Sequence, residues 1–323
     1  MKQKVKTEFK NFKTTLDSDD CPYFFQSLMT HTDSHNPSGS ASRKPIRMGK
    51  ISYLNVLPIY YALDHGYVAH DFVFTSGTPA DLNTRIQAGE LDMSAASSIE
   101  YGRHFEDYLL LPDVAIGSQG PVQSVLLLSQ VPLSQLQDKT ILFSSQTHTS
   151  AALLRLLVRE HLDLNVTYET GDITARLSAG NPPTAFLAIG DEALRLRTHP
   201  DFPYSLDLGQ AWLEWTGLPF IFGVWIGRKP GDEKERASIV TGSRQLLAAK
   251  AWGSDQIPFF ARLVSEQGIL DYQALISYFQ GLVYDFGPRE QTGLHLFYQK
   301  LYAHGELDRI PELCFVSIPT DHE

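Results

Sequence analysis

The chain alternates short apolar runs with longer segments whose apolar residues recur at helical spacing. The apolar runs predict buried strands, for example over 72–75, 140–144 and 184–189, and the segments between them predict helices. Strands that alternate with helices are typical of an α/β protein in which crossover helices join parallel strands. The last part of the chain is predicted to be helical over 233–252, 257–265, 272–283 and 288–304.

The segment 50–63, KISYLNVLPIYYAL, joins a predicted strand to a predicted helix. We expect a strand over 51–54, a turn at Asn55 and a helix that begins at Pro58, because proline is favoured at the first helical position. Asn55 thus follows a strand and precedes a helix N-terminus, where open α/β sheets bind ligands and free N–H groups favour anions. Its side chain either caps the helix or offers a donor and an acceptor to a ligand.

Hydroxyl residues occupy two further junctions of the same kind. Ser97 and Ser98 begin a helix after the strand predicted over 91–95, and Thr149 or Ser150 caps the helix after another strand. One such junction is ordinary capping. Three junctions, counted with the one at Asn55, predict a cleft that is lined by helix N-termini and suited to a carboxylate ligand.

Three more residues are candidates for a site. Ser124 lies at the start of a strand predicted over 122–129, where a hydroxyl group is more often structural than catalytic. Asp191 follows Gly190 at the end of another strand, and it either caps a helix, accepts a ligand hydroxyl group or acts as a base. His148 is a candidate general base, although a single loop histidine is more often neither base nor ligand.

Composition narrows the classes of function. A chain of 323 residues that is 43% apolar suggests about two domains. Its net charge of −10, without a basic stripe between aromatic residues, argues against a nucleic-acid partner. No apolar run is long enough to span a membrane. Cys21 and Cys314 make neither a metal cluster nor a disulfide framework, and they fit a reducing cytoplasm.

The first 45 residues differ from the rest of the chain. They are polar, they contain a linker-like stretch, SHNPSGSAS (34–42), and they lack the apolar core of a secretory signal. We predict a disordered extension or an over-long reading frame, for which Met48, just before the first predicted strand, is an alternative start.

Motifs that bind a metal or a nucleotide cofactor, or that carry a hydrolase nucleophile, are absent from the sequence. It has no HExxH, no CxxC, no dinucleotide fingerprint and no GxSxG. We therefore predict no metal and no cofactor, so that any chemistry would rest on Asn, Ser and Thr side chains, backbone amides and one acid.

Five motifs stand in the order in which the chorismate dehydratase family has them, and the chain resembles this family from about residue 46 to about residue 305. The motifs are SYLNVLP (52–58), GELDMSAASSIEY (89–101), LPDVAIGSQGPVQSVLLLS (111–129), AIGDEAL (188–194) and WTGLPFIFGVW (215–225). Singly they are weak signals, but in this order they are specific.

The resemblance implies a type II periplasmic-binding-protein-like fold, in which two α/β lobes enclose a ligand cleft and two strands cross between them. In this chain SVLLLSQ (124–130) would leave the first lobe and FGVWIG (222–227) would return. Lobe 1 would then comprise 46–125 and 221–323, and lobe 2 would comprise 126–220.

The resemblance also implies a reaction. The family enzyme is a carbon–oxygen hydro-lyase of the futalosine route to menaquinone, and it converts chorismate to 3-[(1-carboxyvinyl)oxy]benzoate and water without a cofactor. Asn55 and Ser124 would be catalytic, and the enolpyruvyl carboxylate of the substrate would accept the proton. Six further residues would contact the substrate: Ser97, Ser98, Thr149, Ser150, Gly190 and Asp191.

Two alternatives stay open beside the dehydratase. Most relatives of this fold only capture solutes, so one alternative is a non-catalytic protein that binds small carboxylates. The other is 1,4-dihydroxy-6-naphthoate synthase of the same pathway, whose opening motif differs from SYLN (52–55). The expected partner is in each case a small molecule, and the sequence predicts no oligomeric state.

Overall fold

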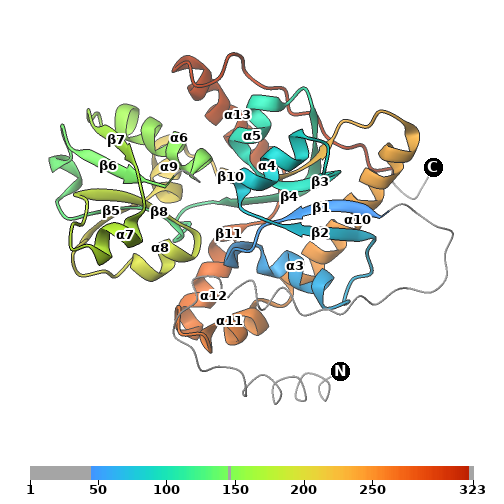
Figure 1. Cartoon of the computed structure of the whole chain (residues 1–323), viewed down its shortest axis with the longest axis horizontal. Helices are drawn as coiled ribbons and strands as arrows, with labels where there is room; N and C mark the ends of the chain where they lie inside the picture. Colours follow the sequence, from blue (N-terminus) through green and yellow to red (C-terminus); the bar gives the residue numbers. More distant parts are fainter. Residues whose placement is uncertain (1–44, 145–146, 320–323) are drawn as a thin grey trace. The chain divides into compact units, whose positions relative to one another are not determined.

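The computed structural model describes residues 45–144 and 147–319, and the predictions made for residues 1–44 lie outside this range. Two sheets, A and B, organise the described residues (Figure 1). The strands of sheet A are β1 (Ile46–Lys50), β2 (Phe72–Ser76), β3 (Met93–Ser97), β4 (Tyr108–Ser118), β10 (Phe220–Arg228) and β11 (Leu282–Val283). Those of sheet B are β5 (Val125–Ser129), β6 (Thr140–Phe143), β7 (Thr167–Thr170), β8 (Ala185–Ile189) and β9 (Tyr204–Asp207).

Both sheets are mixed, and each has a parallel core. Sheet A has the order β11-β4-β10-β3-β1-β2, and sheet B has the order β7-β6-β8-β5-β9. In sheet A, β1 is parallel to β2 and to β3, whereas β10 is antiparallel to β3 and β4. In sheet B, β6 is parallel to β7 and β8, whereas β5 is antiparallel to β8 and β9. This confirms the α/β class.

Helices connect the strands of each sheet and fill the end of the chain. Sheet A is connected by α3 (Leu57–Asp64), α4 (Pro79–Gln87) and α5 (Ser98–His104), and the 3₁₀ helix η1 (Leu54–Val56) precedes α3. Sheet B is connected by α6 (His148–Leu156), which continues into the π-helical turn η3 (Leu157–His161), and by the 3₁₀ helix η2 (Leu133–Gln135), α7 (Ile173–Ser178), α8 (Gly190–Leu196) and α9 (Leu208–Thr216). The last four are α10 (Glu233–Ser254), α11 (Ile257–Ser265), α12 (Tyr272–Gly281) and α13 (Pro288–Ala303).

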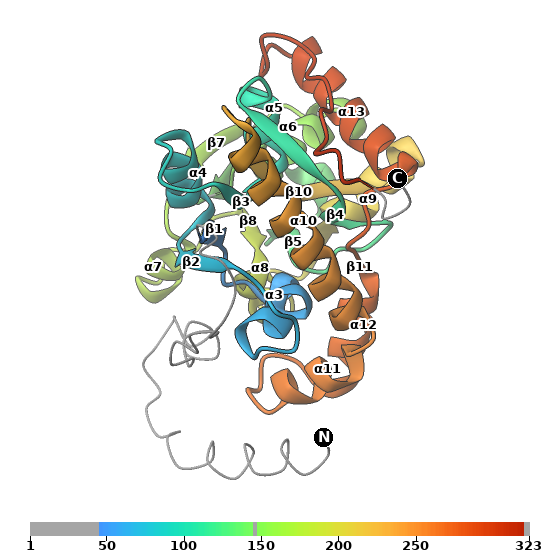
Figure 2. The same cartoon turned by 90° about the vertical axis from the view of Figure 1, so that its right-hand side faces the viewer.

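The long helix α10 packs closely on α3, as both views show (Figures 1 and 2). A Cβ atom at Gly253 would lie 1.7 Å from the carbonyl oxygen of Pro58, so only glycine allows this approach. Helix α3, which follows Asn55, is therefore supported by α10, although the two lie about 200 positions apart in the chain. Among the described residues, no helix combines the length and the apolar character that a membrane crossing needs.

The first strand lies earlier than predicted. We expected it over 51–54, but β1 covers Ile46–Lys50, and Met48 lies fully buried inside it rather than before it. Arg47 and Lys50 interrupt the apolar pattern there. Both are neutralised by long-range ion pairs, Arg47 with Asp92 and Lys50 with Asp64, so that a strand with two cations is stable in the sheet.

The long strand β4 was not predicted, because Pro112 and Asp113 interrupt its apolar run. The strand accommodates them with a positive φ of 55° at Asp113 and with register shifts against β10. The helix predicted over 272–283 ends at Gly281, since Leu282 and Val283 pair with β4 as β11. The other three late helices lie within two residues of their predicted bounds.

The two segments expected to cross between the lobes form strands that stay within one sheet each. In the described residues β5 pairs only with β8 and β9, and β10 pairs only with β3 and β4. The chain passes from sheet A to sheet B through residues 119–124, and it returns after α9 through 217–219. The lobe boundaries themselves, at 125–126 and 220–221, stay a prediction.

Candidate active site

Apart from Ser124, which precedes β5, the predicted site residues follow strands that end at the same edge of a sheet. In sheet A, β1 and β3 are neighbouring parallel strands, and in sheet B so are β6 and β8. Two hydrogen bonds join these two edges: the Leu54 N–H donates to Asp191 Oδ1 at 3.2 Å, and the Ile99 N–H donates to Thr149 Oγ1 at 3.1 Å. The carboxyl ends of four strands therefore face one another, which is where α/β sheets place ligands.

Asn55, Ser124, Gly190 and Asp191 lie together, and we call them the Asn55 group. The backbone of Asn55 is fixed from two sides, because its carbonyl oxygen accepts a hydrogen bond of 2.8 Å from the Tyr284 hydroxyl and the neighbouring Leu54 amide binds Asp191. Its side-chain Oδ1, by contrast, is buried and has no hydrogen-bond partner among the described residues. A buried polar atom without a partner is rare in folded proteins, and it suits a ligand donor.

Asp191 does not cap its own helix, as one sequence interpretation had it. The N-cap of α8 is Ile189, and the carboxylate of Asp191 reaches across to the loop of Asn55 instead. Burial raises the pKa of Asp191, and the Leu54 N–H and the charge of Arg195 oppose this shift. The residue therefore orients the Asn55 loop from sheet B.

Ser124 lies just before β5, which begins at Val125 rather than at the predicted residue 122. Its carbonyl oxygen accepts the Gly190 N–H at 2.7 Å, so this amide is already used within the protein. Gly190 has a φ of +58°, which favours glycine, and a Cβ there would lie 3.4 Å from the ring of Tyr53. The Ser124 hydroxyl donates to the Val122 carbonyl oxygen at 3.3 Å and accepts from the Tyr278 hydroxyl at 3.2 Å.

Ser97, Ser98, Thr149 and Ser150 form a second cluster, which we call the Ser98 group. Ser98 is fully buried, and its Oγ lies 3.3 Å from Thr149 Oγ1. Since Thr149 also accepts the Ile99 N–H, these two hydroxyl groups and one free amide in the first turn of α5 satisfy one another. Ser97 is the N-cap of α5 but makes no capping bond, and its buried Oγ has no partner among the described residues.

The helix of Thr149 begins earlier than predicted. Its N-cap is Thr147, whose hydroxyl donates to the Ser144 carbonyl oxygen at 2.7 Å, so neither Thr149 nor Ser150 caps α6. Ser150 is 8% exposed. His148, the candidate base, is the first residue of α6 and is partly buried. The prediction of hydroxyl groups at a helix start is right, but their roles differ from capping.

Sequence reasoning missed the residues that hold the Asn55 group in place. Tyr278 and Tyr284 bond to Ser124 and Asn55, and the ring of Tyr53 lies against Gly190. Glu192 was also missed: burial, helped by the charge of Asp172, raises its pKa to about 7. Tyr53, inside SYLNVLP, and Glu192, inside AIGDEAL, carried a local signal. Tyr278 and Tyr284 did not, because they lie far along the chain from the residues that they bind.

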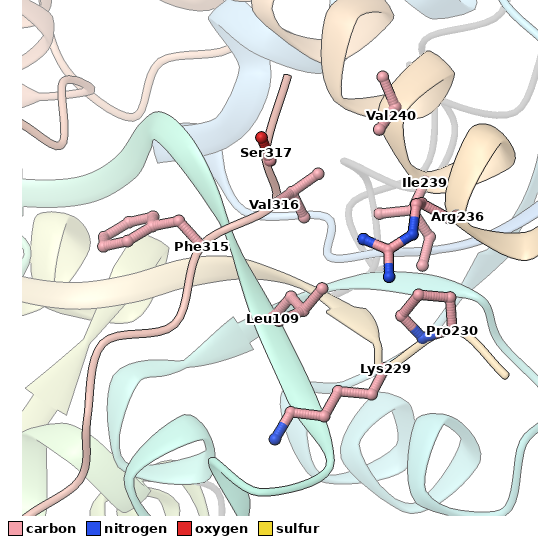
Figure 3. Close-up of a pocket in the computed structure, with 9 residues that line it drawn as sticks. All are labelled: Leu109, Lys229, Pro230, Arg236, Ile239, Val240, Phe315, Val316 and Ser317. Carbon is pink, nitrogen blue, oxygen red and sulfur yellow. The ribbon is translucent and has the colours of Figure 1, made fainter. Parts of the chain in front are cut away.

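A surface pocket elsewhere in the chain is lined by two cations and several apolar side chains (Figure 3). Its lining residues are Leu109, Lys229, Pro230, Arg236, Ile239, Val240, Phe315, Val316 and Ser317. It contains no member of the Asn55 group or the Ser98 group, so it is separate from the candidate active site.

Comparisons with known proteins agree with this architecture. A family model described as menaquinone biosynthesis matches residues 46–303. A chorismate dehydratase of Thermus thermophilus is 30% identical over 201 residues, which cover 58% of this chain and 71% of that protein. One of Campylobacter jejuni is 30% identical over 179 residues, which cover 54% of this chain and 64% of that protein.

Solved structures show the fold. The periplasmic aliphatic sulphonate binding protein SsuA of Escherichia coli superposes with a TM-score of 0.61 and 15% identity, over 87% of this chain and 94% of that one. This confirms a periplasmic-binding-protein-like fold built on the two α/β sheets. Because the family model spans 46–303, well over half of the chain, the protein belongs to the menaquinone biosynthesis family.

Proposed function

We propose that this protein is a chorismate dehydratase, a hydro-lyase that converts chorismate to 3-[(1-carboxyvinyl)oxy]benzoate and water. Two relatives that bear this name support the proposal. The observation that carries it within the structure is the Asn55 side chain. Its Oδ1 is buried at the point where four strand ends meet, and it has no hydrogen-bond partner in the part of the chain that the structure describes. A ligand with hydroxyl groups would supply the missing donor.

The proposed reaction requires the protein to position the substrate rather than to supply a cofactor. The proton on the ring carbon that bears the enolpyruvyl ether is transferred to the enolpyruvyl carboxylate of the same molecule. The electron pair of that C–H bond forms the new ring double bond while the bond from the ring to its hydroxyl oxygen breaks. The leaving oxygen takes the proton from the enolpyruvyl carboxyl group and forms water, which restores the carboxylate. Aromatisation drives the step, so the protein holds the carboxylate near the proton and excludes water.

The residues divide these tasks between them. Asn55 would bind the reacting part of the ring through its amide, and Ser124 would donate a hydrogen bond to a substrate oxygen. Ser97, Ser98, Thr149 and Ser150 would hold a carboxylate at the start of α5 and α6, with the free Oγ of Ser97 as the direct donor. Gly190 and Asp191 would form the wall on the side of sheet B.

The acids beside this site are compatible with a substrate that carries two carboxylates. Burial raises the pKa of Asp191, and it raises the pKa of Glu192 to about 7. A carboxyl group with a pKa near 7 is about half neutral at neutral pH, so its repulsion of an anionic ligand is reduced.

The test is turnover of chorismate by the full chain without added cofactor. We expect loss of the diene absorbance and, by mass spectrometry, an aromatic product that is lighter by one water. Binding of chorismate in a thermal-shift assay without any turnover would contradict the proposal, and the protein would then be a carboxylate-binding protein.

The origin of the base is tested separately with Asp191→Asn and His148→Ala. We expect both variants to keep substantial turnover, because the substrate carboxylate takes the proton. If either substitution abolished turnover while chorismate still bound, that side chain would replace the substrate as the base.

We also propose that the enzyme works in the cytoplasm on its small-molecule substrate, without nucleic acid. The net charge of −10 supports the absence of a nucleic-acid partner, since phosphate backbones repel an acidic protein. Fractionation of cells that express the full chain, with turnover measured in each fraction, tests the location.

A further inference from the structure

Two buried tyrosines from one late segment reach both residues proposed to be catalytic. Tyr278 lies in α12 and Tyr284 directly follows β11, and they are 1% and 9% exposed. The Tyr278 hydroxyl lies 3.2 Å from Ser124 Oγ, and the Tyr284 hydroxyl lies 2.8 Å from the Asn55 carbonyl oxygen. One short piece of chain thus contacts both residues.

Both tyrosines act as donors over the whole range of working pH. Burial raises the pKa of Tyr278 and of Tyr284 well above the usual value for tyrosine, so each hydroxyl group keeps its proton. The carbonyl oxygen of Asn55 can only accept a hydrogen bond, which fixes the direction of the Tyr284 bond. Tyr278 correspondingly donates to Ser124 Oγ.

The bond from Tyr278 has a consequence for Ser124. It occupies one lone pair of the Ser124 oxygen, so the proton of Ser124 must point elsewhere, and in this structure it points at the Val122 carbonyl oxygen at 3.3 Å. That bond is long for a hydroxyl donor and is readily exchanged for a better acceptor. A negatively charged or hydroxyl oxygen of a ligand is such an acceptor.

We infer that Tyr278 and Tyr284 are positioning residues, an inference that rests on the proposed function. Tyr278 fixes the rotamer of Ser124 and occupies one of its lone pairs, so that the Ser124 hydroxyl group donates its proton to the substrate. Tyr284 fixes the backbone of Asn55 so that the unpaired Oδ1 keeps its place at the facing strand ends. Neither tyrosine contacts the reacting atoms; each acts through the residue that it binds.

Double-mutant cycles test this inference for Tyr278. Tyr278→Phe removes one hydroxyl group and is expected to lower kcat about tenfold, the effect of one lost hydrogen bond to a neutral group, with a smaller change in KM. In a Ser124→Ala background the same substitution should have almost no further effect, because the residue through which Tyr278 acts is gone. Equal effects in both backgrounds would overturn the inference.

The matching cycle joins Tyr284→Phe to Asn55→Ala. We expect Tyr284→Phe to lower kcat about tenfold in the wild-type background and hardly at all once the Asn55 side chain is absent. If Tyr284 were purely structural, Tyr284→Phe would instead lower the thermal midpoint, and its effect on kcat would multiply with that of Asn55→Ala. Circular dichroism melts of every variant separate the two cases.

Tyr101→Phe is the matched control. Tyr101 is also fully buried, and its hydroxyl donates at 2.7 Å to a backbone carbonyl oxygen, that of Glu312, outside both groups of site residues. Loss of this hydroxyl should leave kcat within about twofold, whatever it does to stability. A tenfold loss of kcat here would mean that removal of any buried hydroxyl slows turnover, and the inference would fall.

Failure of the proposed function is distinguishable from failure of the inference. If the wild-type protein does not convert chorismate, the function fails, and the inference is then judged from crystal structures of Tyr278→Phe and Tyr284→Phe. A rotated Ser124 hydroxyl and a displaced Asn55 side chain would support it. If both side chains stay where they are in the wild type, it is overturned.

Discussion

Apart from Ser124, the residues of the Asn55 group and the Ser98 group lie at comparable places, after parallel strands and near helix starts, but their polar atoms differ in their hydrogen bonding. In the Ser98 group, the hydroxyl groups of Ser98 and Thr149 bond to each other, and Thr149 Oγ1 also accepts the Ile99 N–H. In the Asn55 group, the backbone is fixed by Tyr284 and Asp191, and the side-chain Oδ1 of Asn55 is left unpaired. The protein itself satisfies the hydroxyl groups of Ser98 and Thr149, whereas the Asn55 group is held rigidly with an open acceptor.

This difference shows why a hydroxyl group at a helix start is weak evidence of a ligand site. Such a group first satisfies the free amides of nearby helices, and only what is left over can bind a ligand. The remainder in the Ser98 group is Ser97, whose buried Oγ has no partner among the described residues. The Asn55 group should therefore govern turnover, and the Ser98 group should govern stability and the binding of a carboxylate.

The largest expected effect is that of Asn55→Ala. It removes the amide that would bind the reacting ring, and we expect kcat to fall about 10²- to 10³-fold, as for loss of one transition-state donor. The unfolding free energy should change little or rise, because an unpaired buried acceptor is removed. Turnover of chorismate and urea unfolding measure the two quantities.

Asn55→Asp is the informative companion to this variant. It keeps the size and one oxygen but replaces the NH₂ donor with a negative charge. Turnover as low as in Asn55→Ala would mean that the donor is needed, whereas near-normal turnover would contradict the role given to the amide.

The sequence predicted which junctions carry polar residues but not what those residues bond to. The helix predicted over 257–265 has those bounds, because its apolar spacing is a local property. The strand at Ile46–Lys50 was misplaced because its cations are neutralised by distant partners, Asp64 and Asp92. A prediction from the local hydrophobic pattern treats Arg47 and Lys50 as polar surface positions, so it placed the strand in the next apolar run.

The same limit applies to the site itself. Asn55 and Ser124 could be named from motifs, whereas the tyrosines that bind them are 229 and 154 positions away in the chain. No period or spacing links such residues, and only the folded chain places Tyr284 and Tyr278 beside them. The sequence thus predicts the site residues themselves but not the residues that bind them.

A smaller effect, and of another kind, is expected in the Ser98 group. Thr149→Val keeps the shape of the side chain but leaves the Ile99 N–H without its acceptor in a buried place. We expect the unfolding free energy to fall by about 1–3 kcal/mol, the cost of an unsatisfied buried donor. Urea unfolding measures this, and kcat should change less than in Asn55→Ala.

Thr149→Ser is the control for this variant, since it keeps the oxygen and loses only a methyl group. It should restore most of the lost stability. If Thr149→Val were as stable as the wild type but bound chorismate much more weakly, the hydroxyl would serve the ligand rather than the protein, and the contrast between the two groups would disappear.

The last predicted effect depends on pH and concerns Glu192, which lies next to Asp191 at the start of α8. Burial raises its pKa in the folded protein to about 7 from an ordinary value of 4.5. Between these two values the unfolded chain ionises at this position while the folded chain stays protonated. The unfolded state then binds fewer protons, so the free energy of unfolding falls as pH rises through this window.

Glu192→Gln removes this titration and makes the effect measurable. The wild type should lose at most ~3 kcal/mol relative to Glu192→Gln between about pH 4.5 and pH 7.5, and less in practice, because water partly screens the side chain. Urea unfolding of both proteins at several pH values gives the difference directly. Above pH 7, where the wild-type carboxylate is charged, Glu192→Gln should also bind the dianionic chorismate more tightly, because one negative charge beside the Asn55 group is gone. A pH-independent difference in stability would mean that Glu192 titrates alike in both states, and the acids of α8 would then repel the substrate at full strength.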